Sequence, residues 1–394
     1  MRTPATAVRA AALLTLALAS VLSFPSRARA ETLEQKVERL ERIIKQQQER
    51  IEKLEGRKAA PSAPAEPKVK IGGDFRLRYS IDDRDRYSKG TDQRDRIRVR
   101  FRVKLTFNYS AKLRFIARLT TRNHTLDDRL AEGTTAYFDR FYADWRPTDS
   151  LTVLAGVFSN RFYNSEMMWD PIFTNMGLYG ELHGSGESSS WKVKAAAIIV
   201  QDDYWSGIAD DLYLMALGVQ FKWKIASKTT LDLRLNYLDF SDEITTLDLG
   251  SNRGNYNTGG LRTDEYDLIN PYVAVVCKLR NGKPLKLWSE LVHNTGADEE
   301  DTGWQVGASL GKLWKEGDWM VSAYYEELEA NSAVDIFTRF NFHGGMTNAK
   351  GFNVTLSYTV RDNWIVQLRA YITQAIEGDK YDWDNYQFQT IVKF

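Results

Sequence analysis

The chain has 394 residues, with 53 Lys and Arg against 52 Asp and Glu and a formal net charge of +1. This balance gives no basic excess of the kind that indicates nucleic-acid binding, and a single cysteine, Cys277, excludes a disulfide framework or a Cys-rich metal or haem site. The length fits either two or three soluble domains or one large barrel, and nothing in the composition calls for a cofactor.

Residues 1–30 have the features of a cleaved export signal. Arg2 and Arg9 form a positive start, residues 10–22 are apolar, and Ala28-Arg29-Ala30 is a small-x-small cleavage site. There is no cysteine near this site for a lipid anchor, and no other run approaches 18 apolar residues. We therefore expect an exported protein that is either soluble outside the cytoplasm or a transmembrane barrel.

Residues 31–56 predict a short α-helical coiled coil. Its seam positions alternate four and three residues apart, and they are Leu33, Val37, Leu40, Ile44, Gln47, Ile51 and Leu54. A helix of fewer than four heptads is marginal alone, so we interpret it as an oligomerisation element, the alternative being a solvated single helix. Residues 57–68 contain three prolines among Ala, Ser and charges, which predicts an extended linker before the remaining segment, 69–394.

The clearest periodic segment is residues 96–107. One alternate set is apolar (Ile97, Val99, Phe101, Val103, Leu105, Phe107), and the other is basic or polar (Arg96, Arg98, Arg100, Arg102, Lys104, Thr106). A period of two predicts a β-strand with one apolar and one cationic face. By itself this strand fits either a soluble sheet or a barrel wall.

The same period recurs to Phe394 and predicts sixteen strands. Short connections, such as 146–150 and 280–283, alternate with long ones, such as 82–95, 159–176 and 331–348. This alternation is typical of a transmembrane antiparallel β-barrel. An arginine facing lipid costs about 2–4 kcal/mol at the bilayer midplane, so we expect the apolar set of residues 96–107 to face lipid and the arginines to face water inside.

These features together resemble Gram-negative outer-membrane porins. The coiled coil, the linker and the Val-Lys-Ile-Gly-Gly-Asp-Phe-Arg-Leu-Arg-Tyr segment from Val69 look like the putative-porin group and are similar to phosphate-selective porins. The resemblance implies a passive diffusion channel of the outer membrane, in contact with its lipid and assembled as a homotrimer. The last strand, ending in Phe394, looks like the segment that the barrel-assembly machinery recognises.

The resemblance also implies the residues of a pore constriction. In general porins the loop between the fifth and sixth strands folds inward, and the matching segment here, 159–176, carries Glu166 and Asp170 but lacks the Pro-Glu-Phe-Gly-Gly motif of many of those loops. The facing wall in the family is basic, and the early strands here supply Arg76, Arg78, Arg98, Arg100, Arg102, Arg114, Arg118 and Arg140. Because arginine stays ionised, this wall should favour anions.

Three alternatives stay open. A phosphate- or oxyanion-selective channel would use the planar arginine fork, although Asp232, Glu290 and Glu326 are also expected to face inward. A structural tether would contact the cell wall through the coiled coil. A barrel enzyme would need a nucleophile beside a histidine, but the four histidines, His124, His183, His293 and His343, are scattered and have no recognisable serine motif.

Overall fold

The structure is a computed structural model that describes residues 38–39, 41–49, 68–86, 90–121, 124–125, 135–201, 212–241, 265–378 and 381–394. Contacts divide the chain into two compact units, residues 1–66 and residues 67–394. The predicted export signal lies outside the described residues, as does nearly all of the predicted linker. The second unit contains all of the described strands.

The first unit is described only where it is helical, at residues 38–39 and 41–49. Arg42 and Glu38 are one helical turn apart and form an exposed ion pair of 3.6 Å. Helix is what the heptad pattern predicts here, whereas the assembly of this helix into a coiled coil stays a prediction. In the part of the chain that the structure describes, no helix is long and apolar enough to cross a membrane.

The second unit consists of antiparallel strands joined in chain order. They are β1 (Val69–Arg86), β2 (Gly90–Asn108), β3 (Leu113–Thr120), β4 (His124–Thr125), β5 (Tyr137–Thr148), β6 (Leu151–Ser159), β7 (Thr174–Ser185), β8 (Ser189–Gln201), β9 (Leu212–Ala226), β10 (Thr229–Phe240), β11 (Asp267–Lys278), β12 (Pro284–Asn294), β13 (Thr302–Gly311), β14 (Trp319–Leu328), β15 (Ala349–Arg361), β16 (Trp364–Ala375) and β17 (Asp382–Lys393). A short 3₁₀ helix, η2 (Asp335–Phe337), precedes β15.

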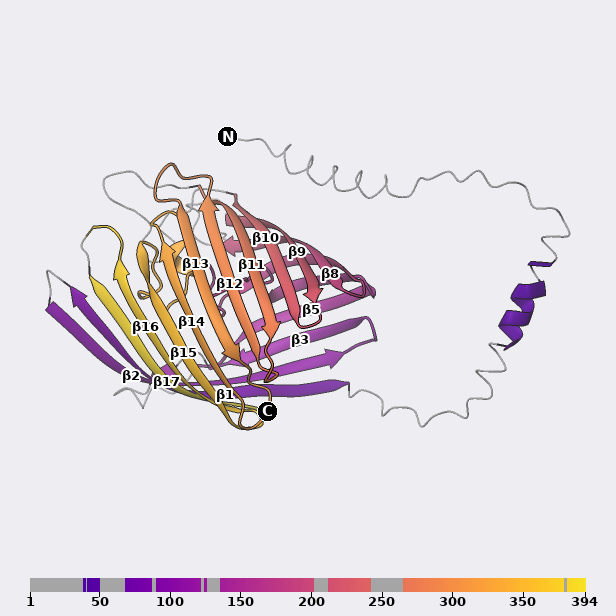
Figure 1. The fold of residues 1–394 in the computed structure, drawn as a ribbon, viewed down its shortest axis with the longest axis horizontal. Helices are drawn as coiled ribbons and strands as arrows, with labels where there is room; N and C mark the ends of the chain where they lie inside the picture. The colour runs from indigo at the N-terminus through magenta and orange to yellow at the C-terminus, as the bar shows by residue number, and fades with distance from the viewer. Residues whose placement is uncertain are drawn as a thin grey trace. The chain divides into compact units, whose positions relative to one another are not determined.

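The sheet closes on itself because β1 pairs with both β2 and β17 (Figure 1). The two-residue β4 pairs with β2, as β3 does, so β3 and β4 occupy one strand position of the barrel. The barrel therefore has sixteen strand positions, which confirms the predicted fold class and strand number. Closure leaves no unpaired edge, the condition that lipid imposes on a sheet.

The alternation in β2 sorts side chains as expected. Phe101 is 41% exposed and Ile97, Leu105 and Phe107 are similarly exposed on the outer surface, whereas the arginines between them are partly buried on the inside. The apolar face therefore meets lipid and the cationic face lines the interior. Cys277 of β11 belongs to the outward set, where its thiol contacts the hydroxyl of Thr229.

One predicted loop is wrong. Residues 82–95 are mostly strand, because β1 and β2 stay in register up to the Arg86–Gly90 pair, and only residues 87–89 lie between the two strands. Asp82 faces Arg94 and Arg84 faces Asp92 across this extension. Opposite charges on facing strands stabilise a hairpin. Outside the hydrocarbon core of the membrane the hairpin needs no apolar face. The apolar period therefore ends before the strand does.

Candidate functional site

A basic wall lines the inside of β1, β2, β3 and β5. All eight arginines predicted for the early strands lie on these strands, and the register brings them together in rows. Arg76 lies opposite Arg100, and Arg78 lies opposite Arg98. Lys104, Arg118 and Arg140 form a second row across β2, β3 and β5. The fold thus gathers cations that are distant in the sequence onto one side of the interior.

Carboxylates on the same strands pair with part of this wall. Asp74 accepts hydrogen bonds from Arg100 at 2.8 Å and Arg102 at 2.7 Å. Asp139 binds Arg118 at 2.8 Å, and Asp144 binds Arg114 at 2.6 Å.

Two other arginines of the wall, Arg78 and Arg98, have no such acid among the described residues. Arg78 is 5% exposed and donates from Nε to the amide oxygen of Gln389, 3.1 Å away. Among the described residues Arg98 has no carboxylate within 4.0 Å of its guanidinium. In the described part of the chain, Asp74, Asp139 and Asp144 pair with four of the eight arginines, and the inward sets of these strands carry more cations than acids.

The connection from β6 to β7, residues 160–173, folds into the barrel. The amide of Asn236 on β10 donates to the carbonyl oxygen of Phe162 at 2.9 Å, and the amide of Asn164 donates to Asn270 on β11 at 2.6 Å. Lys194 of β8 donates to the carbonyl oxygen of Arg161 at 3.1 Å. These bonds satisfy loop backbone and amide groups away from bulk water. The sequence left the position of this loop open, and the structure places it inside.

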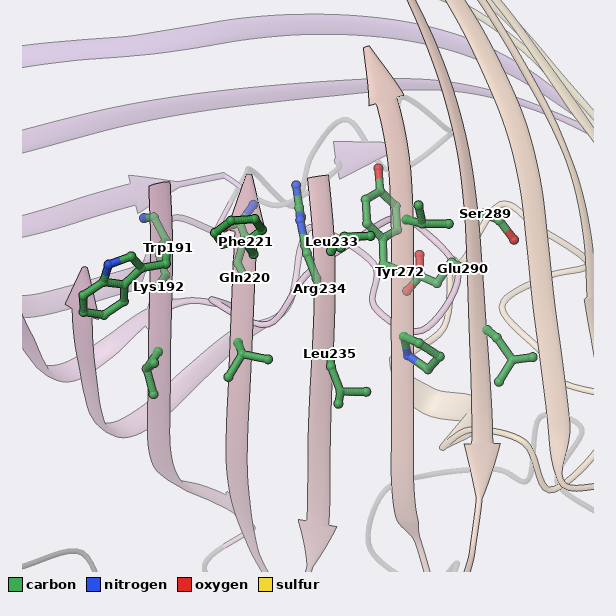
Figure 2. A pocket seen from close by; sticks show the side chains of 15 residues that line it. Trp191, Lys192, Gln220, Phe221, Leu233, Arg234, Leu235, Tyr272, Ser289 and Glu290 are labelled. Carbon is green, nitrogen blue, oxygen red and sulfur yellow. The ribbon is translucent and has the colours of Figure 1, made fainter. Parts of the chain in front are cut away.

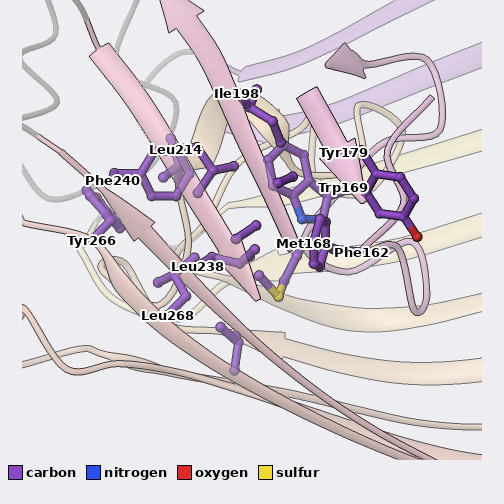
Figure 3. Packing of buried hydrophobic residues seen from close by; sticks show 14 of the residues in the cluster. Phe162, Met168, Trp169, Tyr179, Ile198, Leu214, Leu238, Phe240, Tyr266 and Leu268 are labelled. Carbon is purple, nitrogen blue, oxygen red and sulfur yellow. The ribbon is translucent and has the colours of Figure 1, made fainter. Parts of the chain in front are cut away.

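An apolar cluster anchors this loop (Figure 3). From the loop come Phe162, Met168 and Trp169, and from the inner face of the wall come residues near the long-loop ends of their strands, including Ile198, Leu214, Leu238 and Leu268. Inward apolar side chains are unusual where a lumen is wet, and they mark the part of the wall that the loop covers. Burying them stabilises the loop by about 1.5–3 kcal/mol for each fully buried large side chain.

Glu166 of this loop reaches β16 and the connection from β14 to β15, residues 329–348. Its carboxylate lies 3.3 Å from Nη1 of Arg369 and 3.4 Å from Nε of Arg339. The hydroxyl of Tyr371 accepts a hydrogen bond from Arg369 at 2.8 Å and lies 3.4 Å from Glu166. Asp170 lies 3.6 Å from Arg339 and accepts a hydrogen bond from the backbone of Phe340. The two predicted acidic residues thus lie together, against two cations.

The electrostatics of the two loops agree with this geometry. Burial disfavours the charge on Glu166, but Arg339 and Arg369 outweigh burial and hold the pKa of its carboxyl below the ordinary value. Burial also disfavours the charge on Arg339, but Glu166, Tyr371 and Asp170 raise its pKa well above the ordinary value. Both groups are therefore charged at neutral pH, and each holds the other.

The connection 329–348 is fixed at a second point by His343. This side chain is 1% exposed, its Nδ1 lies 3.0 Å from the hydroxyl of Thr373, and its ring packs on Tyr381 and Trp383. Burial, with a smaller contribution from Arg84, lowers its pKa to about 3. The imidazole is therefore neutral under ordinary conditions and acts as a packed element.

The three acids predicted to face inward on later strands do so, but they are covered. Asp232 binds Arg234 at 2.8 Å, Glu290 binds the amide of Asn270 at 3.0 Å, and Glu326 accepts a bond from Gln305. Glu290 and Glu326 are 2% and 1% exposed, and Asn270 also holds Asn164 of the inward loop. Glu290 therefore holds the loop through Asn270, whereas Asp232 and Glu326 bind side chains of the strands.

The histidines whose side chains are described sit in unrelated places. His183 lies 3.5 Å from Glu181, His293 lies 3.3 Å from Asp301, and His343 packs as above. These neighbours do not form a nucleophile-base pair. In the described part of the chain no three His, Cys, Asp or Glu side chains are grouped as metal ligands.

Two cations of this site, Arg369 and Arg339, were not predicted from the sequence. Arg369 could have been found, because it lies on the inward alternate set of β16 with Gln367 and Tyr371. Arg339 could not, because it lies in a connection whose path has no period. Its place beside Glu166 depends on how two loops pack.

Comparison with known proteins decides the family. A family model described as "Putative porin" matches residues 72–265 and 277–394. The chain belongs to this porin family. No curated protein sequence matches it. This porin therefore lies in the outer membrane and forms a diffusion channel, and it is not an enzyme.

Solved structures agree on the fold. A high-pH structure of Pseudomonas putida OprB superposes with a TM-score of 0.56 at 10% identity, covering 83% of this chain and 94% of that one. Salmonella typhi OmpF in complex with daunomycin gives a TM-score of 0.51 at 10% identity, covering 83% and 97%. At this identity the likeness concerns the barrel architecture alone.

Proposed function

We propose that this porin is a water-filled channel for small hydrophilic solutes and ions that favours anions. The observation that carries the proposal is the double engagement of Glu166 by Arg339 and Arg369. The acid of the inward loop is neutralised by cations brought from elsewhere, while the early-strand arginines outnumber their carboxylate partners. The loop and the basic wall together would form the constriction.

The physical basis is the range of fixed charge in a narrow aqueous passage. Guanidinium groups remain charged at every ordinary pH, and their field acts within about 8 Å before physiological salt screens it. Arg76 and Arg78 face the interior on β1 close to the loop cation Arg339. A ring of cations around a passage raises the local concentration of anions and repels cations.

The deciding experiment is the reversal potential of the refolded protein in a planar bilayer under a KCl gradient. We expect anion selectivity that falls in a variant carrying Arg98→Ala, Arg100→Ala and Arg102→Ala. A matched control removes three cations of the short turns, with Lys112→Ala, Lys283→Ala and Lys315→Ala, and should keep the selectivity. Cation selectivity in the unmodified protein would overturn the proposal.

A phosphate- or oxyanion-selective channel is the second candidate. The clustering of Arg76, Arg78, Arg98 and Arg339 favours it, because guanidinium forks bind tetrahedral oxyanions in two-point fashion. Phosphate added to a chloride current would then block it at concentrations at which bromide does not. An equal effect of phosphate and bromide would leave a general anion-preferring pore.

Three assembly statements belong to the same proposal. The porin would form a homotrimer, as the resemblance to outer-membrane porins implies. Its C-terminal strand, in which Phe394 stacks on Phe101 with ring centroids 5.8 Å apart, would be read by the barrel-assembly machinery. The N-terminal helix would contact the cell wall, and pull-down of cell-wall fragments by the full chain but not by a chain lacking residues 31–56 would support this tether.

A further inference from the structure

The short-turn rim of the barrel is charged unevenly. The turns β9–β10, β11–β12 and β13–β14, which are adjacent in the barrel, carry five cations, Lys228, Arg280, Lys283, Lys312 and Lys315, against Glu316 and Asp318. The other four short turns carry one lysine, Lys112, against Asp149, Glu187 and Asp362. We call the first set the basic rim. In the described residues none of its five cations forms an ion pair.

Aromatic side chains hold part of the basic rim at the outer surface. The ammonium of Lys283 lies 3.7 Å from the ring centroid of Trp319, and that of Lys312 lies 4.4 Å from the ring of Trp314. Trp319 belongs to the outward alternate set of β14, with Val321. Trp rings and lysines at strand ends are positioned at headgroup level in membrane proteins. These cations therefore face the lipid headgroups rather than the lumen.

An apolar groove of about 670 Å³ opens on the outer surface of β8 to β12, the strands that two of these turns connect (Figure 2). Trp191, Phe221, Leu233, Val273 and Leu291 rise around it. Its floor is low because Ser289 is small and because Pro271 interrupts the regular pairing of β11 with β12. The shape and chemistry suit a hydrocarbon chain lying along the wall.

The groove and the basic rim are spaced like the two parts of one lipid. Leu233 follows Lys228 by five residues and Ser289 follows Lys283 by six, which is about 16–20 Å along a strand. With strands tilted about 40°, the depth is about 12–15 Å, close to half of a hydrocarbon core of about 30 Å. A headgroup on the turns would therefore place its acyl chain in the groove.

We propose that this surface is a binding site for an anionic phospholipid of the periplasmic leaflet, with its phosphate on the basic rim and an acyl chain in the groove. Short turns face the periplasm in outer-membrane barrels, so the lipids that reach this rim are those of the inner leaflet. Five cations without an ion-pair partner, beside a lipid-facing groove, attract a negatively charged headgroup. A zwitterionic headgroup has no net charge and would gain no such attraction. Among the short turns the charge pattern singles out the basic rim, because the other four carry one lysine against three acids.

The test is native mass spectrometry of the refolded full chain in micelles containing equal amounts of phosphatidylglycerol and phosphatidylcholine with the same acyl chains. We expect phosphatidylglycerol adducts to exceed phosphatidylcholine adducts by about tenfold or more. Arg280→Gln, Lys283→Gln and Lys312→Gln together should abolish this preference. The matched control, Lys112→Gln, Arg361→Gln and Lys393→Gln, should keep it.

A second variant separates the groove from the charges. Ser289→Phe fills the groove without changing the rim, and it should reduce adducts of both lipids while leaving the ratio between them. Equal adducts of the two lipids in the unmodified chain would overturn the proposal, as would a loss of preference in the control triple. Conversion of the oligomer to monomers by Ser289→Phe would also overturn it, because the groove would then be a subunit contact.

Discussion

Glu166 and Arg369 are 203 residues apart in the chain, yet their side chains meet inside the barrel at 3.3 Å. The contact joins the loop after β6 to the inner face of β16, and Arg339 completes it from a second loop. A charge-assisted hydrogen bond of this kind contributes about 1.5–3 kcal/mol. Removing the carboxylate of Glu166 should change both the charge inside the barrel and the position of the loop of residues 160–173.

Glu166→Gln should make the channel more anion-selective, because Arg339 and Arg369 lose the carboxylate that neutralises them. The reversal potential under a KCl gradient should move further toward the chloride equilibrium value. Glu187→Gln, which removes a carboxylate from an exposed turn, is the control and should leave the potential where it was. A shift toward cations in Glu166→Gln would contradict the proposed role of this pair.

Trp169→Ala should loosen the inward loop. Trp169 is 5% exposed and its ring lies 4.7 Å from that of Phe337, which belongs to η2 of the other inward connection. Truncating a buried tryptophan costs about 3–5 kcal/mol, so the loop should leave its seat for part of the time. Single-channel recordings should show a larger and noisier conductance.

The control for that change is Trp314→Ala. Trp314 is 80% exposed on a turn, and its removal should leave the conductance of the open channel unaltered. If both variants gave the same recordings as the unmodified protein, the loop would not limit the current.

Acid should destabilise the packing of the connection 329–348 against the barrel wall, through protonation of His343. Its pKa is lowered to about 3 by burial and by Arg84, whereas an unfolded histidine titrates near 6.5. The contribution of the neutral imidazole is therefore fully present above about pH 6.5 and is lost as pH falls from there toward 3, by up to about 1.4 kcal/mol per pH unit. Trypsin cleavage after Arg339 should become faster over this range.

His343→Gln removes the titrating group and is the matching test. Its cleavage rate should depend less on pH between 6.5 and 4.5 than that of the unmodified chain, measured with a pH-matched protease standard. If the cleavage rates of both proteins depended on pH in the same way, a group other than His343 would be responsible for the pH dependence.

Gly344→Ala should displace the same loop by direct overlap. Gly344 has φ +73°, and an added Cβ would lie 2.0 Å from the ring of Trp383. Gly378→Ala is the matched control, since Gly378 has φ +77° and nothing lies within 4 Å of its added Cβ. Both variants carry backbone strain of about 1–3 kcal/mol, but only Gly344→Ala should expose Arg339 to trypsin.

The sequence predicts the wall of this barrel better than its contents. Each strand repeats the choice made in residues 96–107, because lipid demands an apolar face and tolerates no buried charge there. The orientation of Arg98 and Arg100 followed from that rule alone.

The interior follows no such period. Phe162 and Met168 look like ordinary loop residues until they meet the inward apolar side chains of β8 to β11. The prediction of a loop at residues 82–95 is wrong for a different reason. Beyond Ile81 charged pairs replace the apolar face. The apolar period, which depends on contact with lipid, therefore ends although the strand continues.

The ion pairs of Glu166 depend on the order in which the strands are made and join the barrel. Its partners, Arg339 and Arg369, follow it by more than 170 residues, so the loop after β6 has no cation to hold until the last third of the chain has been made and threaded. Contacts of such long sequence separation form late. A barrel intermediate lacking β16 and β17 would therefore hold this loop against β8 to β11 while Glu166 still lacked Arg369. The ion pairs of Glu166 are completed only with the final strands, in the same step that closes the barrel.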